Sequence, residues 1–120
     1  MPGNPRPLSV TILACVYIAV GAVGFAAHLG ELQANHLFRF DGLWVELVRL
    51  LAAAAGAFLL QGHNWARWLA IAWMAFHVVV SVFHNFGEFA VHCLFCVVIA
   101  WFLFRPAAAR YFRGAPAAPA

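Results

Sequence analysis

The chain contains four long apolar runs, and their length is the feature that most constrains its fold. The runs extend over residues 8–28, 43–60, 65–84 and 87–104, and each is about 18 to 21 residues long. A helix rises about 1.5 Å per residue, so a run of about 20 residues crosses the hydrocarbon core of a bilayer. Because no water is present there to satisfy backbone amides, such a run must be helical. We therefore predict an all-α, polytopic membrane protein whose four transmembrane helices form an up-down bundle.

The composition indicates that lipid, and not water, is the solvent of this chain. Of its 120 residues, 66% are apolar and 9% are charged, whereas about a quarter of the residues in a typical soluble domain are charged. Seven arginines, four acids and no lysine give a net charge of +3. That charge is too sparse for a nucleic-acid interface, so we expect the lipid bilayer, and no nucleic acid, as a partner.

The sequence divides the chain into three parts. We expect residues 1–7 to be a flexible Pro/Gly-rich lead and residues 8–105 to be the transmembrane domain. Residues 106–120 contain two arginines, Arg110 and Arg113, and end in alanine and proline. They predict a basic segment on the membrane surface, followed by a disordered tail.

Polar and turn-forming residues separate the runs. They predict a loop at residues 30–42 and tight turns at 61–64 and 85–87. Asn64 is the expected N-cap of the third helix. Four spans joined in this way place both chain ends and the second turn on the same side of the membrane.

The arginines are unevenly divided between the two sides, which predicts an orientation. The side that holds the chain ends carries five of them: Arg6, Arg67, Arg105, Arg110 and Arg113. The other side carries Arg39 and Arg49, together with all four acids. By the positive-inside rule, we expect both termini in the cytoplasm.

The histidines lie mostly on the opposite, outer side and suggest a metal site. His28, His84, Glu88 and His92 are each near the outer end of a predicted helix. Imidazole and carboxylate groups are ligands for transition metals, so these four residues could converge on one ion. The alternative is that they are interfacial polar residues, wetted by lipid headgroups. The sequence leaves both open.

His77 lies deeper in the third run and suggests a different cofactor. It is seven residues from His84, which is too far along a helix for both to bind one ion. With a partner on another helix, His77 could be an axial ligand of a haem. The alternative is a single hydrogen bond to a neighbouring helix.

Cys93 and Cys96 form a CxxC motif near the outer end of the fourth run. In this motif the chain resembles the vitamin K epoxide reductase family, a four-helix membrane fold with a CxxC at the outer end of a helix. The resemblance implies a thiol redox pair. That family passes electrons through a second cysteine pair in an outer loop, however, and residues 30–42 contain no cysteine. The alternative is that both cysteines only pack between helices.

Small residues and one charge pair predict how the first two helices pack. Ala22 and Ala26, like Ala52 and Gly56, are four residues apart and share a helix face. Small faces let membrane helices approach closely, either within the chain or between copies of it. Glu46 and Arg49 are three residues apart, so we expect them to form an interfacial ion pair.

Residues 6–113 resemble small bacterial membrane proteins that have no assigned activity. The resemblance rests on NWARWL at the start of the third run and FRPAAARYF at the exit of the fourth. It implies a four-helix topology but supplies no catalytic motif. We expect the protein to lie in a bacterial inner membrane.

Three functions are compatible with these features. The first is a non-catalytic subunit that packs with copies of itself, or with other membrane subunits, in a larger assembly. The second is a membrane protein that binds a transition metal or haem through its outer histidines. The third is a small transporter or channel that encloses a path by oligomerising. We expect the first, because nearly all of the chain is apolar helix and no catalytic motif is present.

Overall fold

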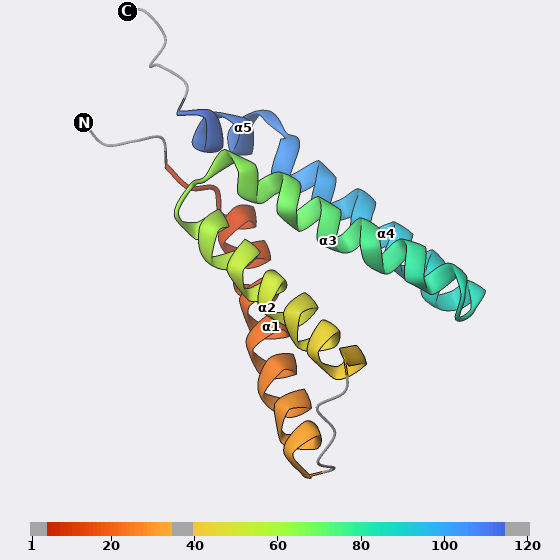
Figure 1. The fold of residues 1–120 in the computed structure, drawn as a ribbon. Coiled ribbons are helices and arrows are strands. Elements are labelled where there is room, and N and C mark those ends of the chain that lie inside the picture. The colour runs from red at the N-terminus through yellow and green to blue at the C-terminus, as the bar shows by residue number, and fades with distance from the viewer. Residues whose placement is uncertain (1–4, 35–39, 115–120) are drawn as a thin grey trace, which may run out of the picture.

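A computed structural model describes residues 5–34 and 40–114, and these residues are almost entirely helical. In chain order the helices are α1 (Leu8–Ala34), α2 (Phe40–Leu60), α3 (Asn64–Val82), α4 (Phe86–Phe104) and α5 (Pro106–Arg113) (Figure 1). No strand occurs in the described ranges. The all-α prediction is confirmed.

Four helices are long and apolar enough to cross a membrane. The candidate spans are Leu8–Gly30, Leu43–Leu60, Asn64–Val82 and Phe86–Phe104. They agree with the four predicted runs to within about two residues at each end. The architecture is therefore that of a multi-pass membrane protein.

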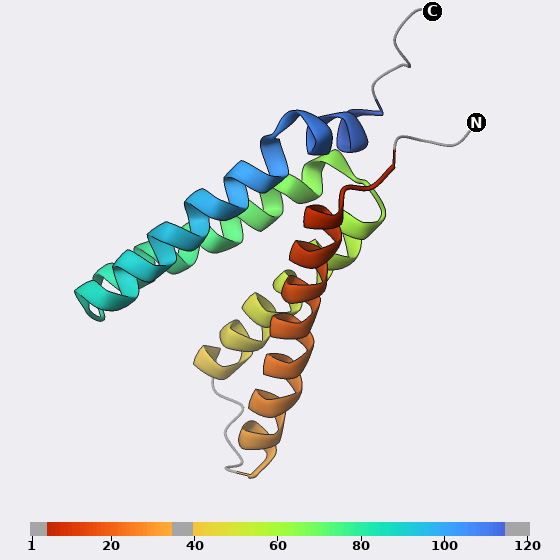
Figure 2. The ribbon, with the colours of Figure 1, turned by 180° about the vertical axis from the view of Figure 1, so that it is seen from behind.

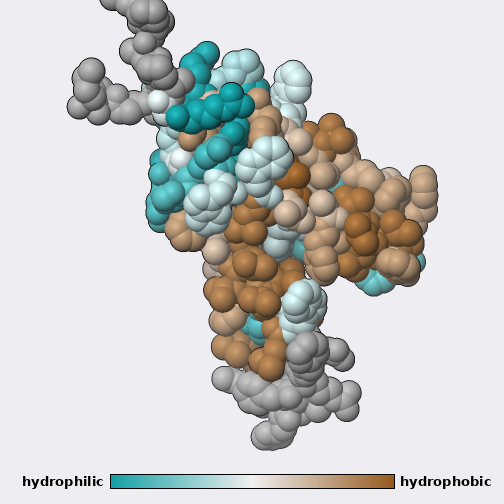
Figure 3. Space-filling model, turned by 45° about the horizontal axis from the view of Figure 1, so that its top comes forward, coloured by the Kyte–Doolittle hydropathy of each residue, from teal (hydrophilic) through white to brown (hydrophobic). Residues whose placement is uncertain are grey.

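The four spans form two antiparallel hairpins, α1 with α2 and α3 with α4. The hairpins meet at one end of the molecule, which we call the closed end. This end holds the start of α1, the turn between α2 and α3, and α5. The hairpins diverge toward the end of α1 and the α3–α4 turn, which we call the open end (Figures 1 and 2). The up-down order was predicted, and the divergence was not. Hydrophilic residues gather at the closed end, and hydrophobic surface covers much of both hairpins (Figure 3).

Glycine allows α1 and α2 to approach backbone to backbone. A Cβ added to Gly56 would lie 2.5 Å from the carbonyl oxygen of Ala14, and one added to Gly21 would lie 2.6 Å from the carbonyl oxygen of Arg49. Both distances are far inside van der Waals contact, so no larger residue fits without moving a helix. Ala52 is also fully buried. The predicted small face of α2 is thus used within the chain.

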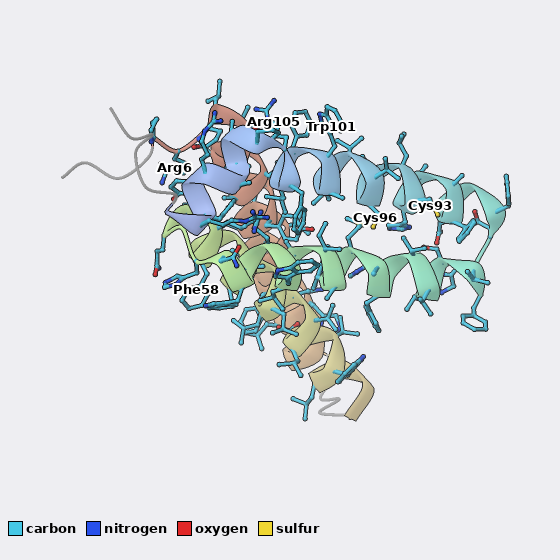
Figure 4. All side chains as sticks on the ribbon, turned by 90° about the horizontal axis from the view of Figure 1, so that it is seen from above. Arg6, Phe58, Cys93, Cys96, Trp101 and Arg105 are labelled. Carbon is cyan, nitrogen blue, oxygen red and sulfur yellow. The ribbon has the colours of Figure 1, made fainter. Side chains whose placement is uncertain are left out.

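The closed end is joined by side chains that cross between the hairpins. Arg105 Nη2 donates to Ser9 Oγ over 2.8 Å, and the Tyr111 hydroxyl donates to the Leu60 carbonyl over 2.8 Å. Arg6 Nη1 donates to the same Leu60 carbonyl over 3.0 Å, which ties the start of α1 to the end of α2 within the first hairpin. Arg6 and Arg105 both lie at this end in Figure 4. Of the arginines that predicted the orientation, Arg105 therefore also joins the two hairpins.

Arg67 is the most deeply buried of these arginines, with only 2% of its surface exposed. Its Nη1 donates to the Leu103 carbonyl over 3.2 Å, and Nη2 donates to Asn64 Oδ1. The guanidinium lies over the Phe104 ring, with its carbon 4.5 Å from the ring centroid, and within 5.2 Å of the Phe112 centroid. Arg67 thereby links α3 to α4 and α5.

Two predictions about helix ends are wrong in detail. The loop expected at 30–42 is shorter, because α1 continues to Ala34 and α2 begins at Phe40; Glu, Leu, Gln and Ala are good helix formers and nothing there stops the helix. Asn64 is not the N-cap of α3. His63 takes that position, since the Asn64 side chain accepts from Arg67 instead.

The ends of the chain are partly described. Pro5–Pro7 of the expected flexible lead are tied to the bundle, because Arg6 donates to both Leu60 and Thr11. The predicted basic segment is the amphipathic helix α5, with Phe112 buried and Arg113 exposed, and it ends at Gly114 with a positive φ of 57°. Residues 1–4 and the expected disordered tail at 115–120 lie outside the described residues.

Candidate functional site

The divergence of the hairpins leaves a cleft whose floor is made by Tyr17 of α1 and Trp73 of α3. The Tyr17 hydroxyl donates to the Ala70 carbonyl over 2.8 Å, and Trp73 Nε1 donates to the Val48 carbonyl over 2.7 Å. The two rings meet edge to face, with centroids 5.5 Å apart. Each side chain can therefore bury its aromatic ring while its O–H or N–H group still donates a hydrogen bond. These two bonds hold the hairpins together at the level where they begin to separate.

Two cavities lie in this cleft, and both are lined by Val20, Trp73 and His77. One has a volume of about 410 Å³ and lies between α1, α2 and α3. The other has a volume of about 470 Å³ and lies between α1, α3 and α4. Both volumes fall in the range of about 300–1,000 Å³ that is typical of small-molecule sites. Few polar side chains line them, chiefly Arg49 in the first, Tyr17 and His92 in the second, and His77 in both.

His77 and His92 face one another across α3 and α4, with ring centroids 5.9 Å apart. Nδ1 of His77 lies 2.8 Å from the Trp73 carbonyl, and Nδ1 of His92 lies 2.8 Å from the Glu88 carbonyl. A carbonyl oxygen only accepts, so both Nδ1 atoms carry the proton. His92 Nδ1 also donates to Ser81 Oγ over 2.6 Å, while the Ser81 hydroxyl donates to the His77 carbonyl. In the neutral ring this leaves Nε2 of each histidine as an acceptor.

Glu46 pairs with His28 and not, as the sequence predicted, with Arg49. Glu46 Oε1 lies 2.5 Å from His28 Nδ1, across the α1–α2 interface, and the carboxylate side chain is 9% exposed. Glu46 faces α1, which brings His28 within reach of it. The predicted Glu46–Arg49 ion pair is therefore replaced by a contact between helices.

Arg49 instead lies across Gly24 of α1. A Cβ added to Gly24 would overlap Nη1 of Arg49 and lie 3.1 Å from its Cζ. The guanidinium therefore occupies the space that the missing side chain leaves. Arg49 makes no hydrogen bond or ion pair with the described residues, and its Nε is buried without an acceptor.

The four predicted metal ligands do not come together in the described structure. His28 is held by Glu46 in the first hairpin. His84 and Glu88 pair with each other over 3.2 Å at the α3–α4 turn, where both are exposed, and His92 bonds to Ser81. Among the described residues no group of three or more His, Cys, Asp or Glu is placed to hold a metal ion. The hairpins diverge where these residues lie, which separates His28 from the other three.

The other predicted site residues lie along the inside of the second hairpin. Cys93 and Cys96 are free thiols, and their sulfurs lie on the side of α4 that faces α3 (Figure 4). Cys96 packs against the buried core, as expected for a cysteine that only packs. The third cysteine, Cys15, is exposed on α1. A redox role for Cys93 and Cys96, and haem ligation by His77, remain predictions.

Two polar residues of the cleft had no part in the sequence-based sites. Tyr17 and Arg49 interrupt otherwise apolar runs, and a polar side chain inside a span is itself a signal of function. Their partners, however, lie on other helices. No family model matches the chain, and no curated protein or solved structure matches it.

Proposed function

We propose that the protein is a non-catalytic membrane subunit that self-associates through the outward face of α1. Four small residues form this face: Cys15, Ala19, Ala22 and Ala26. All four are exposed, and their spacing of four, three and four residues places them on one side of a helix. This exposed small face is the observation that carries the proposal.

The physical basis is the packing that α1 already uses toward α2. In lipid, helices gain little from burying apolar surface, so they associate where small residues allow close van der Waals contact. Ala14 and Gly21 supply such a face toward α2. The exposed face is turned away from both α2 and the cleft, because the cleft walls of α1 are Leu13, Val16, Tyr17 and Val20. A second copy could pack there without entering the cleft.

For location, we propose the inner membrane of a bacterium, with the closed end in the cytoplasm. Five arginines lie at or near the closed end, and the positive-inside rule places such an end on the cytoplasmic side. The exposed indoles of Trp65, Trp68 and Trp101, on the closed-end halves of α3 and α4, support an interface there. The test is a fusion, after Ala120, of a reporter enzyme that is active only outside the cytoplasm. We expect this fusion to show no reporter activity.

Oxidative cross-linking tests the association. Cys15 should be the only cysteine at the interface, so we use a variant with Cys93→Ser and Cys96→Ser and oxidise it in membranes. We expect a disulfide-linked dimer, and light scattering in mild detergent should give at least twice the mass of one chain. Ala22→Leu should return the protein to a monomer, because a large side chain prevents close approach of the helices.

The matched control moves the cysteine to another lipid-facing position. Val79 on α3 is 59% exposed, and Val79→Cys in a variant with Ser at all three natural cysteines should cross-link far more slowly. Equal rates for Cys15 and the Val79→Cys control, together with a monomeric mass, would mean that cross-links arise from random collision. The proposal would then be wrong.

A further inference from the structure

The cleft contains a positive charge, that of Arg49, which no residue in the described part of the chain neutralises. The acid nearest to Arg49 along α2, Glu46, is engaged with His28. Arg49 has no ion-pair partner among the described residues, and its Nε is buried and unsatisfied. Within the hydrocarbon region a charge without a partner is strongly unfavourable, and such residues are normally paired or serve a ligand.

The position of Gly24 shows that this charge is held inside the apolar layer. Arg49 is six residues from Leu43, where its span begins, and Gly24 is six residues from Gly30, where its span ends. Six residues of helix correspond to about 9 Å. Because the guanidinium lies on Gly24, it stays at this depth and does not extend along the helix to the membrane surface, as an arginine near a helix end usually does.

The space next to Arg49 suits a molecule with an anionic head and a hydrocarbon tail. Arg49 lines the cavity of about 410 Å³, whose other walls include Trp44, Val48 and Phe76. This cavity adjoins the apolar one of about 470 Å³ along Val20, Trp73 and His77. A guanidinium recognises carboxylate or phosphate oxygens through paired hydrogen bonds, and the apolar walls would accept the tail.

His77 adds a second polar contact at the border of the two cavities. Its Nδ1 proton is committed to the Trp73 carbonyl, so Nε2 has no hydrogen-bond partner among the described residues. The ring therefore has a free nitrogen that can accept a proton from an acidic head group, or share one with it. A metal cation is a poorer occupant, because Arg49 is positive and none of the described residues that line the cavity has a carboxylate.

We propose that this cleft binds an anionic amphiphile, with its carboxylate or phosphate oxygens on Arg49 and His77 and its hydrocarbon tail along the apolar walls. A free fatty acid and an anionic phospholipid both have this chemistry. The inference does not depend on self-association, which uses a different face of α1, so either proposal can fail while the other holds.

Tryptophan fluorescence gives a direct test, because Trp44 and Trp73 line the cavity next to Arg49. The probe is 9,10-dibromostearic acid, whose bromines quench nearby indoles, added to the protein in nanodiscs of a neutral lipid. We expect saturable quenching with about one site per chain. Unbrominated palmitate should reverse it, whereas palmitic acid methyl ester, which has no charge, should not. Competition by a phosphatidic acid then tells whether a phospholipid occupies the same site.

Variants assign the effect to the guanidinium. Arg49→Gln keeps most of the side-chain volume and removes the charge, and it should weaken binding about ten- to a hundredfold, the loss expected for hydrogen bonds to a charged group. Gly24→Leu should also weaken binding, because it displaces the guanidinium. The matched control is Arg113→Gln, which removes the same charge from an exposed position on α5 and should leave binding unchanged.

Three results would overturn the proposal. One is quenching that increases without saturation, as for lipid partitioning around any membrane protein. Another is equal competition by palmitate and its methyl ester. The third is unchanged binding in a folded Arg49→Gln variant. If Arg49→Gln does not fold, competition by palmitate and by its methyl ester on the natural protein still tests whether binding requires the negative charge.

Discussion

The Tyr17 hydroxyl on α1 donates a 2.8 Å hydrogen bond to the Ala70 carbonyl on α3, and Tyr17 is only 4% exposed. This bond joins the two hairpins at the floor of the cleft, beyond the arginine contacts of the closed end. Together with the bond from Trp73 Nε1 to the Val48 carbonyl, it sets the position at which the hairpins begin to diverge.

Tyr17→Phe should lower the free energy of unfolding by about 1 kcal/mol, the typical net value of one buried hydrogen bond. The ring stays packed against Trp73, so only the bond is lost. Thermal unfolding in mild detergent would measure the change. Tyr111→Phe is the control, since its hydroxyl bonds to the Leu60 carbonyl at the partly exposed closed end, where water can replace it. A larger loss for Tyr111→Phe would contradict this account.

Arg67→Ala should destabilise the protein more than any other single arginine variant at the closed end. It removes hydrogen bonds from a buried guanidinium, each worth about 1.5–3 kcal/mol, and its contacts with Phe104 and Phe112. Arg67→Lys should recover only part of the loss, because an ammonium cannot stack flat or fork between two acceptors. Denaturant titration would rank the variants. Arg113→Ala, at an exposed position, is the control, and similar losses for the two alanine variants would mean that Arg67 is not a structural link.

Gly56→Ala and Gly30→Ala should change stability in opposite directions, although both replace glycine in a helix. The new Cβ at Gly56 would lie 2.5 Å from the Ala14 carbonyl oxygen, whereas nothing lies within 4 Å at Gly30. We expect a loss of about 1–3 kcal/mol from overpacking at Gly56. At Gly30 we expect a gain of up to about 1 kcal/mol from higher helix propensity. Melting temperatures would show both signs, and a stable Gly56→Ala protein would mean that α1 and α2 are not in close contact.

The number, length and order of the helices could be read from the sequence, because each span is a long apolar run bounded by turn residues. The angle between the hairpins could not. The spans are apolar on nearly every face, so periodicity does not indicate which face packs. The divergence follows from specific contacts instead: Gly21 and Gly56 bring α1 onto α2, whereas Tyr17 and Trp73 join the hairpins only part of the way along.

The site was predicted less well, because its partners are distant in the sequence. The three-residue spacing predicted an ion pair between Glu46 and Arg49. The Glu46 carboxylate instead contacts His28 on another helix, and Arg49 occupies the space above Gly24. The glycine that makes room for the Arg49 guanidinium lies on another helix, so no sequence motif marks this contact. His84 and Glu88, predicted as metal ligands, instead pair with each other at the α3–α4 turn, and this contact depends only on local geometry.

The two histidine–glutamate pairs provide the last prediction, because they share chemistry and differ in burial. The side chains of His28 and Glu46 are 20% and 9% exposed, whereas those of His84 and Glu88 are 59% and 50% exposed. Water screens an exposed pair, so its coupling should be below about 0.5 kcal/mol. A buried contact that loses one partner leaves the other unsatisfied, so its coupling should exceed about 1 kcal/mol. Double-mutant cycles with alanine at each position would measure both coupling energies from unfolding in detergent. Equal values would mean that the contact between α1 and α2 is as open to water as the α3–α4 turn, and Glu46 would then be free to neutralise Arg49.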